Sequence, residues 1–188
     1  QKRLINNIKS ALNVDSSKIR DLRNRILIFS DDCSNLKYVF GINSFFKVVE
    51  CDFDLINQTA LSFVSDHKSF RISARRLTKV FKSSQDIQKD VGEFIFNNKD
   101  VKVDLFNPDI NIHIDIIGNK AYIYDNIIKG SGGLPVGSSG VVFIDVADDV
   151  KSVITGFLMM KRGCKIVLSK DLFLLKKFEH GFSIKVRD

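Results

Sequence analysis

Apolar residues recur along this chain with two different periods, and the period changes from one segment to the next. In residues 110–116 every second residue is isoleucine, which is the pattern of a strand with one buried face. Residues 1–13 carry apolar positions three or four residues apart, which is typical of a helix with one face on a core. Segments of both kinds along one chain predict a mixed α/β protein.

The same two periods assign an element to most of the chain. Strands are predicted at 25–30, 45–51, 69–75, 110–116, 121–128, 141–144, 165–168 and 182–186. Helices are predicted at 1–13, 35–41, 54–64, 84–97, 148–160 and 171–180. Asp54 is the expected N-cap of the third helix. Gly118 and Asn119 favour a tight turn between two neighbouring strands.

The composition changes sharply at residues 130–140 (GSGGLPVGSSG), which predicts an interdomain linker. We therefore expect one domain at 1–53, a second at 54–129 and a tail at 141–188. In the tail, strands and helices alternate, and this order predicts a small parallel sheet. The tail is short for a domain that folds alone.

The composition excludes several classes of protein. A chain of 188 residues that is 44% hydrophobic can bury enough apolar surface to escape disorder. Its apolar runs are far shorter than the roughly 20 residues that a membrane span needs, and no secretory leader is evident. Cys33, Cys51 and Cys164 are too widely spaced for a disulfide framework or a zinc site. We expect three buried thiols and a cytoplasmic location.

The net charge of +7 is concentrated in two short segments. Residues 1–25 carry a net charge of +5 and residues 67–85 carry +6, whereas 26–66 carry −4 and the remainder is balanced. The segment 67–85 contains no acid, so ion pairs within it cannot account for its bases. Phe70, Phe81 and several hydroxyl side chains lie between these bases, and this mixture suits a polyanion such as RNA. A solvated basic surface is the alternative.

His113 falls on the strand face opposite the isoleucines, between Asn111 and Asp115. No second histidine or cysteine pairs with it in the sequence. We therefore expect an ordinary exposed or capping histidine and not a catalytic one.

Four segments carry a resemblance to a known family: FRISARR (70–76), KVDLFNPDINIHIDI (102–116), GGLPVGSSG (132–140) and MKRGC (160–164). The chain resembles the tRNA sulfurtransferase (4-thiouridine synthetase) family over most of its length, most strongly at 68–164. The resemblance implies a ferredoxin-like domain at 1–53 without its usual first strand and a THUMP domain at 54–129. It also implies a truncated PP-loop ATP pyrophosphatase domain at 141–188.

The family holds tRNA, chiefly by its acceptor end, through basic residues of the first two domains. The resemblance therefore implies that the basic residues of both segments bind RNA. They are Lys68, Arg71, Arg75, Arg76, Lys79 and Lys82, together with Arg3, Lys9, Arg23 and Arg25. Such contacts are sensitive to salt and largely independent of base sequence.

One departure from the family bears on activity. The family has a Ser-Gly-Gly-x-Asp-Ser loop that binds the pyrophosphate of ATP, and it corresponds here to residues 147–152. Four positions of the loop differ, namely Ala147, Asp148, Asp149 and Lys151, whereas Ser152 is retained. Two aspartates stand in place of the glycines, and each like-charge contact at 4 Å costs on the order of 1–4 kcal/mol. We expect a degenerate ATP loop, no catalytic residue, no metal and no cofactor. Acids there are more plausible as helix caps than as a magnesium site.

Three hypotheses follow. In the first, the protein binds tRNA without catalysis and presents it to a separate sulfur-transfer or other modifying enzyme. In the second, it is an active ATP-dependent sulfurtransferase, for 4-thiouridine or the thiamine thiazole pathway, that works with a partner chain and uses ATP and magnesium. In the third, the strand edges of the tail support assembly, for example as a homodimer.

Overall fold

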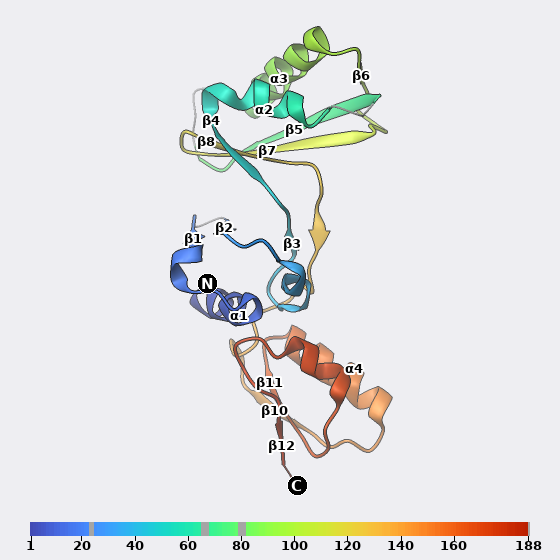
Figure 1. Ribbon diagram of the computed structural model, residues 1–188. Coiled ribbons are helices and arrows are strands. Elements are labelled where there is room, and N and C mark those ends of the chain that lie inside the picture. The colour runs from blue at the N-terminus through green and yellow to red at the C-terminus, as the bar shows by residue number, and fades with distance from the viewer. Residues whose placement is uncertain (23–24, 65–67, 79–81, 188) are drawn as a thin grey trace. The chain divides into compact units, whose positions relative to one another are not determined.

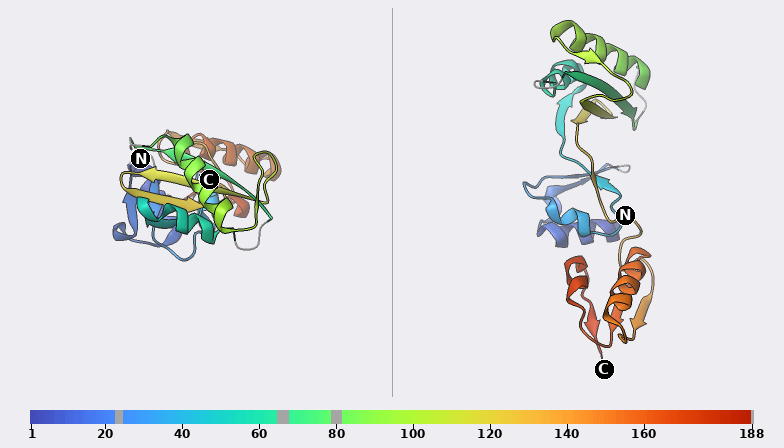
Figure 2. Two further views of the ribbon diagram at one scale, coloured as in Figure 1. Left: turned by 90° about the horizontal axis from the view of Figure 1, so that it is seen from above. Right: turned by 90° about the vertical axis from the view of Figure 1, so that its right-hand side faces the viewer.

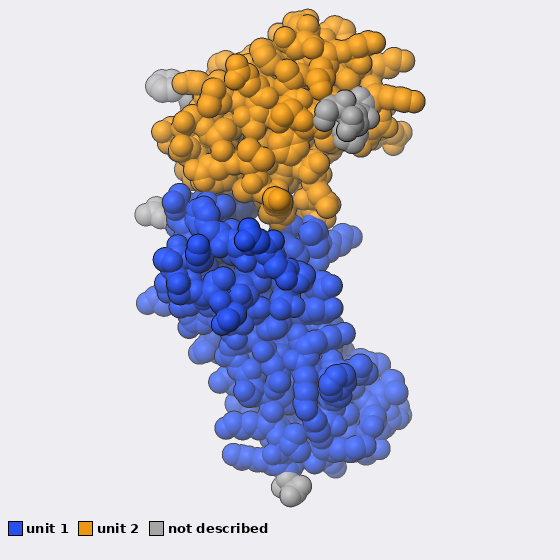
Figure 3. Space-filling model, viewed as in Figure 1, with its two compact units in different colours: residues 1–45, 128–188 blue, residues 46–127 orange. Residues whose placement is uncertain are grey.

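The computed structural model describes residues 1–22, 25–64, 68–78 and 82–187. The chain forms two compact units (Figure 3). The first combines Gln1–Phe45 with Ile128–Asp188, and the second is Phe46–Ile127. Each unit is described by itself below.

A five-stranded sheet forms the centre of the second unit. Its strands, in the spatial order β4-β8-β7-β5-β6, are β4 (Val49–Asp52), β8 (Lys120–Tyr124), β7 (Ile110–Ile117), β5 (Ser69–Arg76) and β6 (Lys102–Val103). β5 is parallel to β6 and β7, whereas β8 is antiparallel to β4 and β7. Helices α2 (Ile56–Ser62) and α3 (Ser84–Asn98) both lie on one face of this sheet (Figures 1 and 2).

The alternation in β7 explains why the helices cover one face only. Ile112, Ile114 and Ile116 are fully buried in a core that the apolar sides of α2 and α3 complete. Burying a side chain of this size contributes about 1.5–3 kcal/mol, which fixes the register of the strand, because a shift by one residue would expose all of them. The residues between the isoleucines must then face the other way.

The local sequence sets the boundaries of these elements. α3 begins at a capping box, in which the Ser83 hydroxyl accepts a hydrogen bond from the Asp86 amide and the Asp86 carboxylate accepts one from the Ser83 amide. β7 and β8 join through Gly118 and Asn119, as predicted, and Gly118 takes the left-handed conformation (φ 63°) that such a turn requires.

The first unit contains three small sheets. β1 (Ile19–Asp21) pairs with β2 (Ile26–Ile28), and β3 (Ser44–Phe45) pairs with β9 (Ile128–Lys129). The third sheet is parallel, with the order β10 (Val141–Ile144), β11 (Lys165–Leu168), β12 (Lys185–Val186). Helix α1 (Lys2–Leu12) packs with the first elements, and α4 (Asp149–Lys161) connects β10 to β11.

The segment predicted as a linker, 130–140, has a fixed conformation. Gly132 donates a backbone hydrogen bond to Ile42 and accepts one from Gly41. Val136 is buried, and its carbonyl accepts a hydrogen bond from the amide side chain of Asn7. The glycines therefore serve close backbone approach within the first unit and not an open chain.

The predicted α/β class is confirmed, and several predicted elements are wrong in detail. The strand at 45–51 is interrupted between β3 and β4, and the strand at 121–128 between β8 and β9. The helices at 35–41 and 171–180 are the 3₁₀ helices Ser34–Tyr38 and Phe173–Phe178. Asp54 does not cap the next helix, because α2 starts after Leu55 with no side-chain cap. The short strands β1 and β6 were not predicted.

The three cysteines are free, but they are half-buried and not fully buried as predicted. Burial and the neighbouring Asp32 raise the pKa of the Cys33 thiol, which favours its neutral form. Within the described residues, no group of three or more histidine, cysteine or acidic side chains is placed to hold a metal ion.

Candidate nucleic-acid interface

The sheet face opposite the helices in the second unit is polar and carries the arginines of the basic segment. Because β5 alternates, Arg71, Ser73 and Arg75 point away from the core that Phe70, Ile72 and Ala74 enter. The parallel register places Ser73 beside His113, and the Ser73 hydroxyl donates a hydrogen bond of 2.8 Å to Asn111 Oδ1. We call this surface the open face of the sheet.

Arg71 and Arg75 lie four residues apart on the open face, with Ser73 between them, and both are exposed. Nη1 of Arg71 donates to the carbonyl of Leu105 at 3.2 Å. Arg75 makes no hydrogen bond or ion pair with the residues that the structure describes. It does lie in register with the buried Asp115, whose carboxylate offsets part of the positive potential. A guanidinium with unused donors is well suited to bind a phosphate.

An aromatic stack lies beside these arginines on the open face. The rings of Phe46 and Tyr124 stack at 3.7 Å between centroids, and those of Tyr124 and His113 at 5.0 Å. Burial lowers the pKa of His113, and the nearby Arg75 lowers it further, so the imidazole is held in its neutral form near pH 7. His113 is therefore a half-buried packing residue, which is more enclosed than the exposed histidine that we expected.

The remaining basic residues of this segment lie at the two ends of β5. Nη1 of Arg76 donates to the carbonyl of Lys82 at 3.0 Å, and Lys82 Nζ forms an ion pair with Asp90 at 2.5 Å. The pKa of Lys82 is raised by this hydrogen bond and charge. Lys68 is exposed at the start of β5, and Lys79 lies outside the described residues. An acid from α3 thus neutralises one base of a segment that contains no acid of its own.

The basic residues predicted near the N-terminus belong to the first unit. Arg3 and Lys9 lie on α1, where Lys9 Nζ donates to the Ser16 hydroxyl at 2.8 Å. Arg25 lies in the turn between β1 and β2, and its carbonyl accepts a hydrogen bond from the Leu22 amide. Arg23 lies outside the described residues.

The predicted degenerate ATP loop, 147–152, lies where β10 leads into α4. Asp148 is the N-cap of α4, and its Oδ1 accepts a hydrogen bond of 3.0 Å from the Lys151 amide. Asp149 forms an ion pair with Lys170 at 3.0 Å, and the buried Ser152 donates its amide to the carbonyl of Asp148. Acids at the start of a helix are stabilised by the helix dipole, as the capping hypothesis predicts.

These residues do not fit the phosphates of ATP. A phosphate needs backbone amides that are bare and closely approachable. Here the Asp148 carboxylate occupies the Lys151 amide, residues 145–152 contain no glycine, and two exposed carboxylates face the same end of the helix. The neighbouring Asp145 carboxylate is also engaged, because it accepts a hydrogen bond from Ser169 Oγ.

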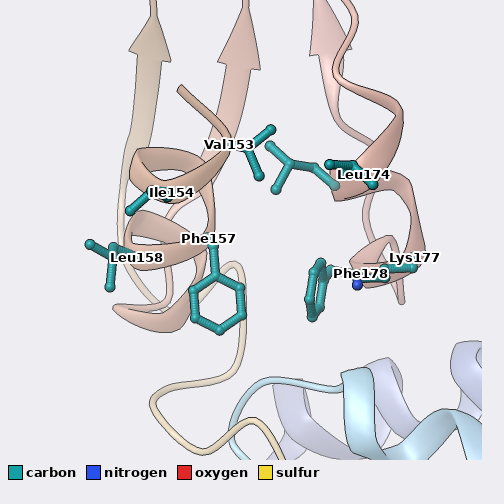
Figure 4. Close-up of a pocket in the computed structure, with 8 residues that line it drawn as sticks. Val153, Ile154, Phe157, Leu158, Leu174, Lys177 and Phe178 are labelled. Carbon is teal, nitrogen blue, oxygen red and sulfur yellow. The ribbon is translucent and has the colours of Figure 1, made fainter. Parts of the chain in front are cut away.

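An apolar pocket lies in the first unit between α4 and the 3₁₀ helix Phe173–Phe178 (Figure 4). Its volume is about 370 Å³, and Phe157 and Phe178 face one another across it with ring centroids 5.4 Å apart. Lys177 is the charged residue of its lining. Apart from Lys177, the lining offers no group for acid–base or nucleophilic chemistry.

Sequence patterns did not indicate the aromatic stack. Phe46 lies just outside β3 and β4, far along the chain from Tyr124, and only the folded sheet brings the two rings together. The alternation in β8 is a weak indication of an aromatic cluster on the open face. Tyr122 and Tyr124 lie on the face opposite the buried Ala121 and Ile123.

Comparison with known proteins agrees with this architecture. The THUMP domain family matches residues 51–126, which lie within the second unit. The crystal structure of PH1313 from Pyrococcus horikoshii superposes with a TM-score of 0.86 and 36% identity, over 100% of this chain and 71% of that one. A crystal structure of a 4-thiouridine synthetase–RNA complex with bound ATP shares the fold, with a TM-score of 0.72 and 24% identity over 89% of this chain and 47% of the other.

Two curated proteins named probable tRNA sulfurtransferase are also similar. The protein from Thermococcus kodakarensis is 36% identical over 182 residues, which is 87% of this chain and 48% of that protein. The protein from Mycoplasmopsis synoviae is 37% identical over 169 residues, which is 88% of this chain and 45% of that protein. The chain thus spans about half the length of these curated relatives.

The helices on one face of the sheet, the polar open face and the matched residues together define a THUMP-domain protein. Its similarity extends beyond that domain to almost the whole chain. The chain belongs to the tRNA sulfurtransferase (4-thiouridine synthetase) family. Among the described residues, no helix combines the length and the apolar character that crossing a bilayer requires.

Proposed function

We propose that this chain binds tRNA without catalysing its modification, and that it presents the tRNA to a separate sulfur-transfer or other modifying enzyme. The observation that carries the proposal is the exposed pair Arg71 and Arg75 on the open face. The guanidinium group of Arg75 has hydrogen-bond donors that are available to a phosphate. Phosphate contacts from such side chains supply affinity that is independent of base sequence. The names of the curated relatives favour tRNA as the ligand.

The loop at the start of α4 supports the non-catalytic part of the proposal. Asp148 caps the helix that it begins, and Asp149 forms an ion pair with Lys170. This arrangement leaves no free backbone amides to bind a pyrophosphate. We therefore propose that the chain uses neither ATP nor magnesium by itself. A cytoplasmic location and a homodimer stay predictions.

Filter binding of tRNA at increasing salt tests the proposal. We expect the affinity to fall linearly in log–log form, and the slope to decrease by about 0.9 for each duplex phosphate contact that a variant loses. Arg71→Ala/Arg75→Ala should weaken binding and flatten the slope. Lys82→Ala is the matched control, since it removes a cation that Asp90 already neutralises. Absence of tRNA binding at low salt, or equal effects of the two variants, would contradict the proposal.

The alternative function is that of an active ATP-dependent sulfurtransferase that works with a partner chain. Membership of the family is the observation that favours it. Titration calorimetry with ATP and magnesium distinguishes the two functions, because the non-catalytic protein should give no heat of binding. Saturable heat on addition of ATP and magnesium would favour the enzyme.

A further inference from the structure

The parallel sheet of the first unit has its helices on one face. Ile144 and Ile166 are buried in the core beneath α4. A Cβ at Gly156 of α4 would lie within 4 Å of these two side chains and of Leu175, which belongs to the 3₁₀ helix Phe173–Phe178. Both helices therefore pack on the same face. Right-handed crossovers explain this arrangement, because β10, β11 and β12 follow one another in one direction across the sheet.

The opposite face of this sheet is apolar at its centre. Val141 and Phe143 point to it, because their neighbours Val142 and Ile144 pack in the core. Val141 is 66% exposed and Phe143 is 58% exposed. The register places the half-buried Val167 of β11 beside Phe143. We call the surface formed by residues 141, 143 and 167 the bare face. Parallel sheets are normally covered on both faces, so this surface is suited to a further packing partner.

Basic side chains border the bare face. The parallel register sets Lys165 and Lys185 in the same rows as the apolar side chains, and Arg187 continues the row just past β12. All three side chains are exposed, and neither lysine makes a side-chain hydrogen bond or ion pair with the residues that the structure describes. One acid, Asp145, also lies on this face, but its carboxylate already accepts a hydrogen bond. The border therefore carries an excess of positive charge.

An acidic helix fits this face in size and in charge. Neighbouring strands lie about 4.8 Å apart, so three strands span ~10 Å, which is the diameter of one helix with its side chains. An apolar centre with a charged rim is typical of a protein interface. A second copy is a poor occupant, because two bare faces brought together would set lysines against lysines. RNA is a poor occupant too, since the valines offer no π-face to a base.

We propose that the bare face docks an acidic amphipathic helix of a partner protein. The apolar side of that helix would cover Val141, Phe143 and Val167, and its acids would lie beside Lys165 and Lys185. The inference rests on the proposed function, since the partner that carries the helix would be the enzyme to which the tRNA is presented. Docking on the chain that holds the tRNA raises the effective concentration of the enzyme at its substrate.

Fluorescence anisotropy with two labelled synthetic peptides tests the inference. Each is an amphipathic helix of about 20 residues with leucine on one side, and the remaining positions are glutamate in the first peptide and lysine in the second. The acidic peptide should bind the wild-type protein, and the basic peptide should not. Phe143→Ser should weaken binding of the acidic peptide about ten- to a hundredfold, as expected when an apolar side chain of this size is lost. Phe173→Ser is the matched control, because Phe173 is 79% exposed but lies on the covered side of the sheet.

Charge reversal provides a second readout. Lys165→Glu/Lys185→Glu should weaken binding of the acidic peptide and allow the basic peptide to bind, because the border of the bare face then carries the opposite charge. Lys151→Glu is the matched control, since Lys151 is an exposed lysine on α4 and should affect neither peptide.

Several results would overturn the inference: no binding of the acidic peptide to the wild type, binding that survives Phe143→Ser, or an equal loss in Phe173→Ser. A dimer in sedimentation that Phe143→Ser dissociates would show that a second copy covers the face. Loss of tRNA binding in Phe143→Ser would assign the face to RNA. Wild-type protein that binds tRNA but not the acidic peptide would refute the docking surface alone, whereas binding of the peptide without tRNA would refute the proposed function.

Discussion

Asp148 offers the sharpest test of whether the loop before α4 is a helix cap or the remnant of a working nucleotide site. Its carboxylate accepts one hydrogen bond of 3.0 Å from the Lys151 amide and lies 3.9 Å from Lys151 Nζ. Replacing an N-cap aspartate by alanine costs about 1 kcal/mol, and the exposed ion pair adds little to that. Asp148→Ala should therefore raise the unfolding equilibrium constant of the first unit about fivefold.

Asparagine caps a helix as well as aspartate does, so Asp148→Asn should keep most of the stability. Asp149→Ala removes an ion pair with Lys170 whose side chains are both about 60% exposed. Its effect should be smaller and should fade as salt rises, because salt screens exposed charges. The two substitutions thus separate a hydrogen-bonded cap from a surface charge.

Urea unfolding followed by far-UV circular dichroism measures these changes, and hydrogen exchange of peptides from 149–161 assigns them to α4. The expected order of stability is wild type, Asp148→Asn, then Asp148→Ala. An alanine variant as stable as the wild type, or more stable, would refute the capping argument. Stabilisation of that kind is typical of residues that are retained for function at the expense of folding.

Two further predictions concern the backbone and the pH dependence. Gly133→Ala should destabilise the protein far more than Gly118→Ala: both glycines have positive φ (74° and 63°), but a Cβ at 133 would lie 2.2 Å from the Lys161 carbonyl oxygen and one at 118 would touch nothing. Thermal melts check this, and similar shifts would contradict it. Because burial lowers the pKa of His113 in the folded state, the unfolded chain takes up the proton first, so stability should fall as pH drops below about 6.5. Urea midpoints measured between about pH 5 and 7 should therefore decline less in His113→Gln than in the wild type. Burial also lowers the pKa of His180, so part of the decline should remain in this variant. An unchanged pH profile would exclude this role for His113.

Strict alternation made the THUMP core predictable from the sequence. In β5 and β7 one face is apolar and the other polar, so only one register buries the apolar side chains. That register places the arginines of β5 on the open face. The segment 171–180 lacked such a constraint. It forms the 3₁₀ helix Phe173–Phe178, which buries Leu175 and Phe178 and has no side-chain cap at Leu172.

Contacts between distant segments account for what the sequence did not indicate. β6 is two residues long and exists because it pairs with the start of β5. The 104–109 loop depends on Asp109, whose partners Lys68 and Ser69 are 41 and 40 residues away. The neutralisation of Lys82 by Asp90 is more local, since the two residues are eight apart, but it depends on the formation of α3. Charge counted along the chain therefore overstates the charge that remains for a ligand.

The two charged sites of this protein differ in how their charges are satisfied, and the difference argues for binding without nucleotide chemistry. At the start of α4, Asp148 is bonded within its own helix and Asp149 to a nearby lysine, so the charges serve the fold. On the open face of the second unit, Arg71 and Arg75 stay exposed although Asp115 and the stack of Phe46, Tyr124 and His113 lie beside them. Folding alone gains little from exposed guanidinium groups, whereas a polyanion requires them. The charge that the fold leaves uncompensated is thus the charge that a folded RNA would neutralise.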